Sequence, residues 1–292
     1  LGHFLVGTIA SLWPLSQLAG EVDGILAFRI MARPRVVEDR DEAAVTTMLK
    51  ALGVDLPIRT IREPTQVDRL ILAEKGIGSY SLARGSSYYH RFMRERNALP
   101  TEDVGKSDRK KLYITRSKLK AIRRGIVGET AIERTFAEAG YEILSPETIP
   151  LSAQIAKYQT AAAIVGLDGT PFHLIPSVCA TDAKIAIIGR RQKSGPSVDF
   201  LGQFEAATGS IPTEIDRMIG EWRPPESAKT KPKIAVLDLE KVYKDLVAAG
   251  FLDASAKFHF PDDEEIETLV SEASSHIGAT YELVDLRFDD PL

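Results

Sequence analysis

Apolar and polar residues alternate in blocks along the first hundred residues, and these blocks predict helices and strands in turn. We expect an apolar helix over residues 2–18, a short strand over 24–28 and a polar helix over 38–52. The run VDRLILA, residues 67–73, is typical of a buried strand. A Gly- and Ser-rich turn then leads into a helix that ends before Pro100, since proline disfavours a helical residue ahead of it. This half is therefore predicted to form an α/β layer.

The second half of the chain repeats strand and helix more regularly. The helix after the strand KLYIT carries Ile132, Phe136 and Ala139 on one face and ends at Gly140. Thr148 is a candidate N-cap for the next helix. Strands that alternate with helices predict a parallel sheet covered on both faces, so the fold class is α/β. The other expected elements are strands at 141–144, 162–165, 183–189 and IAVLDL, a helix after Gly195 that carries Phe200 and Phe204, a helix at 240–249, and one helix and one strand in the acidic end.

Length and a polar break divide the chain into predicted domains. A chain of 292 residues fits two domains. The stretch TEDVGKSD, residues 101–108, is polar and has no apolar period, so the boundary is placed there. We therefore expect domains over 1–105 and 106–250, followed by an acidic extension over 251–292. Because the chain begins with Leu1 inside an apolar segment, we also expect upstream sequence to precede it.

Charge and cysteine content argue against several classes of protein. A net charge of −4 argues against a surface wrapped in nucleic acid, because such binding needs many cations that neutralise phosphates. The single cysteine, Cys179, excludes an intrachain disulfide, and no Cys or His cluster has metal-ligand spacing. We therefore expect a reducing compartment and no metal site. No run of eighteen apolar residues is present, so no membrane-spanning helix is predicted.

Basic residues concentrate in one stretch, residues 106–124. Nine basic side chains there face one acidic residue, Asp108, which gives a local charge of +8. Arg116 and Lys118 follow the strand KLYIT, and ligands of parallel sheets bind beyond the carboxyl ends of the strands. Guanidinium groups form two-pronged hydrogen bonds to phosphate, so a phosphorylated ligand is one interpretation. The alternatives are a solvated basic loop and a contact with an anionic membrane surface.

The segment VGLDGTPFH presents a second candidate site at a strand end. Gly166 and Gly169 would let the backbone approach a ligand closely, and a helix that starts at Thr170 would offer free amides to phosphate. Asp168 is either a base, a partner for a sugar hydroxyl, or a residue that only caps the turn. The segment has neither the glycine fingerprint of dinucleotide binding nor a Walker loop.

Several motifs in order resemble the central block of glycosyltransferase family 61. The block runs from KLYITR through VGETAIERTFAEAGYEIL and SPETIPLSAQIAKYQTAAAIVGLDGTPFHLI. In that family a strand ending in Arg, a helix opening with Glu and a GxHGA loop follow at this spacing. Upstream, GHFLVGTIASLWPL is similar to the family's H-[WF]-L-x-[DE] helix, and the resemblance covers roughly residues 1–245.

The resemblance implies a GT-B-like architecture, with two Rossmann-like domains whose parallel sheets face each other across a cleft. Residues 1–105 would form the acceptor side and 106–250 the side that binds the nucleotide sugar. It further implies an inverting transfer that uses neither metal nor cofactor, from a UDP-linked donor. The chain departs from the family pattern at Asp168, where histidine is usual, and at Gly7, where an acid is expected.

The resemblance also gives expected roles to individual residues. Arg116, supported by Lys118, would bind the donor diphosphate, and Glu129 would lie near the nucleotide. Four residues would line the donor loop, with Asp168 also a catalytic candidate: Gly166, Asp168, Gly169 and Thr170. His3 is the candidate general base that deprotonates the acceptor hydroxyl.

Three hypotheses about function follow. The first is a bacterial glycosyltransferase of surface or capsular polysaccharide synthesis, with a glycan or lipid-linked acceptor, in the cytoplasm or at the inner face of the membrane. The second is a catalytically altered member that binds glycan or nucleotide without turnover. The third is nucleic-acid binding through residues 106–124.

Overall fold

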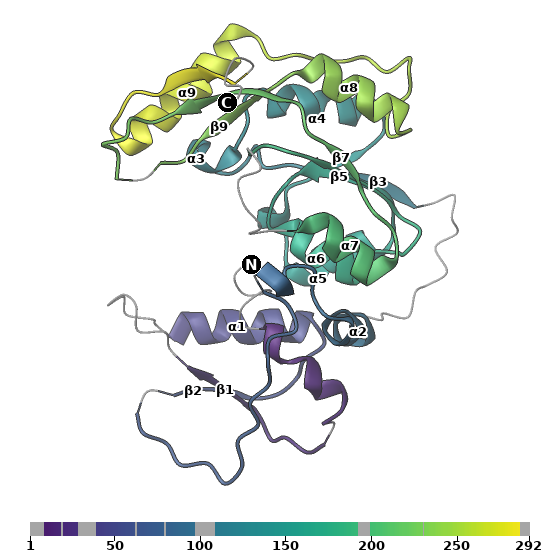
Figure 1. The fold of residues 1–292 in the computed structure, drawn as a ribbon, viewed down its shortest axis with the longest axis vertical. Helices are drawn as coiled ribbons and strands as arrows, with labels where there is room; N and C mark the ends of the chain where they lie inside the picture. Colours follow the sequence, from purple (N-terminus) through teal and green to yellow (C-terminus); the bar gives the residue numbers. More distant parts are fainter. Residues whose placement is uncertain are drawn as a thin grey trace.

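The computed structural model describes most of the chain (Figure 1). The described residues are 9–18, 20–28, 39–61, 63–78, 80–96, 109–191, 199–229 and 231–286. His3, Gly7 and the expected boundary at 101–108 lie outside these ranges. The amino-terminal elements lie at one end of the molecule, helix α9 (Asp263–Ile277) lies at the other, and a parallel sheet lies between them.

A five-stranded parallel sheet forms the centre of the molecule. Its strands are β3 (Lys110–Ile114), β4 (Glu142–Leu144), β5 (Ala161–Leu167), β6 (Lys184–Ile188) and β7 (Thr213–Ile215). They lie in the order β4-β3-β5-β6-β7, and every neighbouring pair is parallel. The α/β class and the parallel sheet predicted from the alternating pattern are therefore confirmed.

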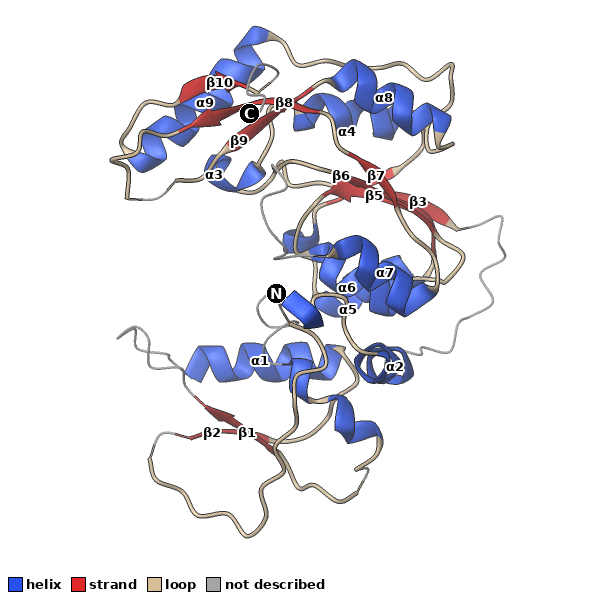
Figure 2. Ribbon diagram, in the orientation of Figure 1, coloured by secondary structure: helices blue, strands red, loops and turns tan. Residues whose placement is uncertain are grey.

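Helices cover both faces of this sheet (Figure 2). They are α4 (Glu129–Glu138), α5 (Leu151–Gln159), α6 (Pro171–Val178), α7 (Phe200–Thr208) and α8 (Leu239–Ala248). Ile164 of β5 is buried in the same apolar cluster as residues of α5, α6 and α7, whereas Val165 is buried with residues of α4 and α8. Successive residues of a strand point to opposite faces, and an apolar residue suits both when both are covered. This explains why the strands are continuous apolar runs.

The amino-terminal part contains a second, smaller parallel pair. Its elements are 3-10 turns at Ile9–Ser11, Trp13–Ser16 and Tyr80–Leu82, strands β1 (Ile25–Phe28) and β2 (Ile58–Ile61), and helices α1 (Asp39–Ala51) and α2 (Ser87–Arg96). Helix α2 packs on α6 and α7, and Phe92 of α2 shares an apolar cluster with Leu174 of α6. The division of the chain into domains at 101–108 stays a prediction.

Two local predictions in this part are wrong. In the described portion of residues 2–18 the chain forms two short 3-10 turns instead of one helix, and Pro14, which lacks an N–H, lies in the second. The expected strand at 67–73 is irregular and exposed, with Leu72 79% exposed. An apolar run becomes a strand only beside a pairing partner, and neither β1 nor β2 pairs with this segment.

Local signals in the second half mostly hold. Helix α4 ends as expected, and Gly140 has a φ of 79°, which favours glycine. The predicted N-cap at Thr148 is wrong: α5 begins after Pro150, and Thr148 Oγ1 instead donates to the carbonyl of Ser145 at 2.8 Å. Thr148 closes a separate 3-10 turn, Pro146–Thr148.

A three-stranded antiparallel sheet packs beside the central sheet. It contains β8 (Met218–Arg223), β9 (Ile234–Leu237) and β10 (Glu282–Asp285), in the order β10-β8-β9. Helix α9 and the short helix α3 (Ala121–Arg124) share an apolar cluster with β9. The acidic end thus forms the predicted helix and strand, and β10 pairs with β8 from the segment before it. Among the described residues, no helix is long and apolar enough to cross a bilayer.

Candidate functional site

The strand order creates a switch point at the carboxyl edge of the central sheet. Strands β3 and β5 are neighbours, but β4 follows β3 on one side and β6 follows β5 on the other. At such a point the loops diverge beyond the strand ends and leave room for a ligand. Arg116 lies two residues beyond β3, and Asp168 directly follows β5. The two residues singled out from sequence therefore lie at this switch point.

The Arg116 side chain lies across the loop that follows β5. An added Cβ at Gly169 would lie 2.9 Å from Nη1 of Arg116, so the glycine makes room for the guanidinium. Arg116 Nη2 donates to the carbonyl of Arg123, near the end of α3. Burial lowers the pKa of Arg116, and the nearby Glu129 opposes that effect. A guanidinium nevertheless stays charged in proteins, so a fixed positive charge lies at the switch point.

Arg190, which follows the neighbouring strand β6, holds Asp168 in place. The Nε of Arg190 donates to the carbonyl of Asp168 at 2.8 Å and lies 2.8 Å from its Oδ1. The Asp168 N–H donates to the carbonyl of Ile188, the last residue of β6, at 2.9 Å. Burial lowers the pKa of Arg190 to about 10, so the side chain remains a cation at neutral pH. The Asp168 carboxylate is thus paired within the protein.

Gly125 lies directly beside the Arg190 guanidinium. It has a φ of 98°, and an added Cβ would lie 2.8 Å from Nη1 of Arg190. A side chain at this position would therefore both strain the backbone and displace the guanidinium. Gly125, the C-cap of α3, and Gly169, after β5, each leave space for one of the two arginines.

Glu129 is a buried carboxyl group beside Arg116. It is the first residue of α4 and is 3% exposed. Its Oε1 accepts hydrogen bonds from the Arg116 N–H at 2.6 Å and from Thr115 Oγ1 at 3.3 Å. Its Oε2 has no hydrogen-bond partner among the described residues. Burial raises the pKa of Glu129 to about 8, opposed by the Arg116 N–H, so the group is mostly protonated at neutral pH.

The family model described as Glycosyltransferase 61 matches residues 1–181. The chain belongs to glycosyltransferase family 61. Membership implies glycosyltransferase activity, with a sugar donor and an acceptor as substrates. No curated protein matches the chain. The resemblance read from the motifs is thus confirmed, and the matched region includes Arg116, Glu129 and Asp168 but ends before Arg190.

The remaining expected site residues of this family 61 chain occupy different surroundings. Gly166 lies inside β5, where an added Cβ would lie 2.9 Å from both Cβ and the carbonyl oxygen of Ile114. Its small size therefore serves the close packing of two strands. Thr170 is the N-cap of α6 and makes no side-chain capping bond, and Lys118 is exposed in the turn after Arg116. His3 lies outside the described residues.

Sequence reasoning missed Arg190 and Arg191, which follow the apolar strand AKIAIIG. The rule that led to Arg116, a cation directly after a parallel strand, applies equally to these two arginines. Gly125 gave no such signal, because only the folded chain shows that it faces Arg190.

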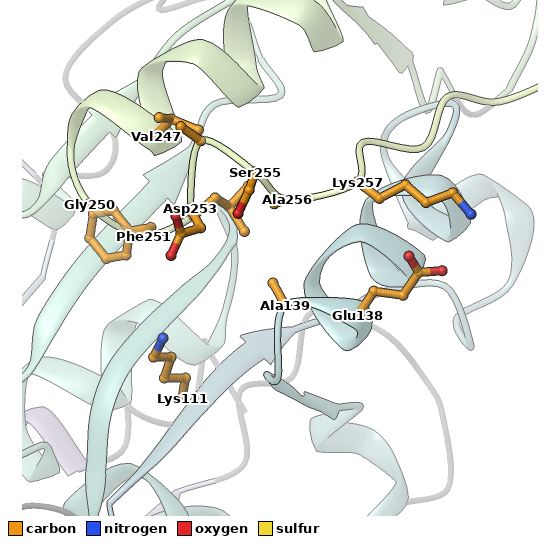
Figure 3. Close-up of a pocket in the computed structure, with 12 residues that line it drawn as sticks. Lys111, Glu138, Ala139, Val247, Gly250, Phe251, Asp253, Ser255, Ala256 and Lys257 are labelled. Atoms are coloured by element: carbon orange, nitrogen blue, oxygen red, sulfur yellow. The ribbon is translucent and has the colours of Figure 1, made fainter.

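Two hollows lie at the opposite, amino-terminal edge of the sheet. The larger, of about 740 Å³, lies between Lys111 at the start of β3 and the loop Gly250–Lys257 (Figure 3). The smaller, of about 350 Å³, lies near the starts of β6 and β7. The labelled charged side chains in Figure 3 come from β3 (Lys111), from α4 (Glu138) and from the loop itself (Asp253 and Lys257). Neither hollow includes Arg116 or Asp168. Among the described residues, no three His, Cys, Asp or Glu side chains form a potential metal site.

Proposed function

We propose that the carboxyl edge of the central sheet binds the diphosphate of a nucleotide-sugar donor for sugar transfer. The observation that carries this proposal is the position of Arg116, whose guanidinium lies across Gly169 at the switch point between β3 and β5. The start of α6 lies directly beyond Gly169. Guanidinium groups and helix N-termini both favour phosphate, so the two features support the same kind of ligand.

The proposed reaction is an inverting, metal-independent transfer. The acceptor oxygen attacks the anomeric carbon from the face opposite the diphosphate, the bond from that carbon to the diphosphate oxygen breaks, and a general base takes the acceptor proton. Positive charge at Arg116 would stabilise the negative charge that develops on the departing diphosphate. We propose His3 as the base. The mostly protonated Glu129 would add little repulsion to a bound diphosphate.

The wider assignment also remains our proposal. It comprises a GT-B-like pair of domains, with 1–105 on the acceptor side, a UDP-linked hexose or pentose donor, and no cofactor. The acceptor would be a glycan or a lipid-linked glycan of surface or capsular polysaccharide, and the chain would work in a bacterial cytoplasm or at the inner face of the membrane. The parallel pair β1–β2 in the amino-terminal part supports a second α/β unit.

The basic stretch 106–124 gives limited support to nucleic-acid binding. Arg109 is paired with Asp182 at 2.8 Å, and Lys111 lies over the ring of Tyr141. Arg116 lies at the switch point instead of on the same surface as these residues. Arg109 and Lys111 thus serve separate local contacts, and one continuous phosphate-binding face is not favoured.

Turnover with a panel of nucleotide sugars tests the transferase against a member that only binds. We expect release of free nucleoside diphosphate from one donor when an oligosaccharide acceptor is present. Saturable donor binding with no transfer to any acceptor tested would favour the catalytically altered alternative.

A further inference from the structure

We infer that Arg190 is a second cation that binds the donor diphosphate, and that Asp168 acts as a positioning residue for it. The inference rests on the proposed donor site at Arg116. It adds Arg190 as a ligand of the second phosphate and Asp168 as the residue that positions Arg190. The role of Arg190 does not follow from the family match, because Arg190 lies beyond the matched residues 1–181.

Arg190 is mostly buried, and hydrogen bonds to the protein use only part of its guanidinium. Its side chain is 9% exposed, and its Nε is used by Asp168. Within the described part of the chain, no hydrogen bond is made by its Nη1 or Nη2. A guanidinium has five N–H donors. Nη1 and Nη2 are not among the fully buried atoms that lack a partner, so their four N–H groups stay open to a ligand at the strand end. A ligand rich in acceptor oxygens suits these donors, and phosphate binds a guanidinium through two parallel hydrogen bonds.

Arg116 and Arg190 flank the same loop. Arg116 follows β3, Asp168 and Gly169 follow β5, and Arg190 follows β6, and these three strands are consecutive neighbours in the sheet. Neighbouring strands lie about 4.8 Å apart, so the two arginines approach the Gly169 loop from either side. The nearby charges of Arg116 and Arg191 contribute to lowering the pKa of Arg190. A diphosphate placed over the loop would relieve this repulsion.

Asp168 faces Arg190 and is held in place. Its Oδ1 and its carbonyl both contact Nε of Arg190, while its N–H is bonded to the end of β6. The carbonyl accepts the Nε–H hydrogen bond, whereas Oδ1 faces Nε as an ion pair and accepts no hydrogen bond among the described residues. Asp168 therefore orients the guanidinium through both groups, and its charge is matched before any ligand arrives. Asp168 influences the diphosphate through Arg190, and the structure offers this role in place of a general base.

The test compares the affinity of nucleoside diphosphate with that of the matching monophosphate by calorimetry. The nucleoside is the one of uridine, thymidine, guanosine and cytidine whose diphosphate binds the wild-type chain most tightly. We expect Arg190→Ala to weaken diphosphate binding about tenfold or more and monophosphate binding much less. Arg190→Lys keeps the charge but cannot form the two-pronged hydrogen bonds, so it should recover only part of the lost diphosphate affinity. Arg134→Ala is the control, since Arg134 is half exposed and pairs with Glu265 on α9.

A second set of variants tests the positioning role. Asp168→Asn should lower the affinities for the diphosphate and for the corresponding nucleotide sugar by equal factors. The double variant Asp168→Asn/Arg190→Ala should bind the diphosphate no more weakly than Arg190→Ala alone. The double variant also removes both charges, so no unpaired buried ion is left to unfold the chain. An Asp168→Asn effect on the nucleotide sugar alone would overturn the positioning role.

The remaining outcomes separate this inference from the donor site itself. An unchanged ratio of diphosphate to monophosphate affinity in folded Arg190→Ala would overturn the second-cation role while leaving Arg116 as the donor ligand. A wild-type chain that binds no nucleotide would refute the proposed function and this inference together.

Discussion

The backbone N–H of Arg116 donates a 2.6 Å hydrogen bond to Oε1 of Glu129, so a buried carboxyl group at the start of α4 holds the turn after β3. The residue before this turn, Thr115, is also tied to α4, through hydrogen bonds to Glu129 and Glu133. The position of the Arg116 guanidinium thus depends on a carboxyl group that burial keeps mostly protonated at neutral pH.

The pH dependence of stability should change in Glu129→Gln. The pKa of Glu129 is raised from 4.5 to about 8 in the folded chain, so the folded state keeps a proton that the unfolded state releases. Its contribution to stability is fully present below pH 4.5 and is lost as the pH rises toward 8, by about 1.4 kcal/mol for each pH unit. Glutamine does not titrate. In urea unfolding, Glu129→Gln should therefore gain stability relative to wild type between pH 5 and 8, and a constant difference would contradict the buried, protonated carboxyl group.

An added methyl group should move the Arg116 side chain. Gly169→Ala places Cβ 2.9 Å from Nη1 of Arg116, and the backbone of Gly169 is not in the left-handed region. We expect diphosphate affinity to fall about tenfold or more, with a small change in melting temperature. Gly78→Ala is the control, because its added Cβ meets only ordinary contacts, the nearest at 3.6 Å. Equal affinities in the two variants would show that Arg116 does not depend on the space at Gly169.

The irregular segment at 67–73 should tolerate truncation. Leu72 is 79% exposed, whereas Leu174 of α6 is fully buried. Leu72→Ala should change the free energy of unfolding by less than about 0.5 kcal/mol, and Leu174→Ala should lower it by about 2–5 kcal/mol. Denaturant titration of the two variants checks this contrast, and a comparable loss at Leu72 would indicate that the segment is buried in solution.

The proposed base should affect the rate more than binding. His3→Ala should lower kcat by about 10²- to 10⁴-fold and leave the affinity for the donor nearly unchanged. Steady-state rates and calorimetry together make this measurement. Unchanged turnover would remove His3 from the mechanism, and a parallel loss of donor affinity would assign it to donor binding.

Local sequence patterns predicted four of the five strands of the central sheet and two residues of its edge, because strand period and the parallel-sheet rule act over short stretches. The three-residue strand β7 was not expected. Arg116 and Asp168 each follow a strand that the apolar runs identify. Contacts between residues of different strands could not be predicted from local patterns, because the residues are far apart in the sequence. Arg190, for example, pairs with Asp168, which is 22 residues away. The same limit explains the expected strand at 67–73, whose residues suit a strand but find no neighbouring edge.

The most direct test of the account is calorimetric titration of wild type, Arg116→Ala and Arg134→Ala with nucleoside diphosphates. We expect one saturable site in the wild type, retained in Arg134→Ala and lost or weakened at least about tenfold in Arg116→Ala. No saturable binding by the wild type, or equal affinity in a folded Arg116→Ala variant, would contradict a donor site at the carboxyl edge of the sheet.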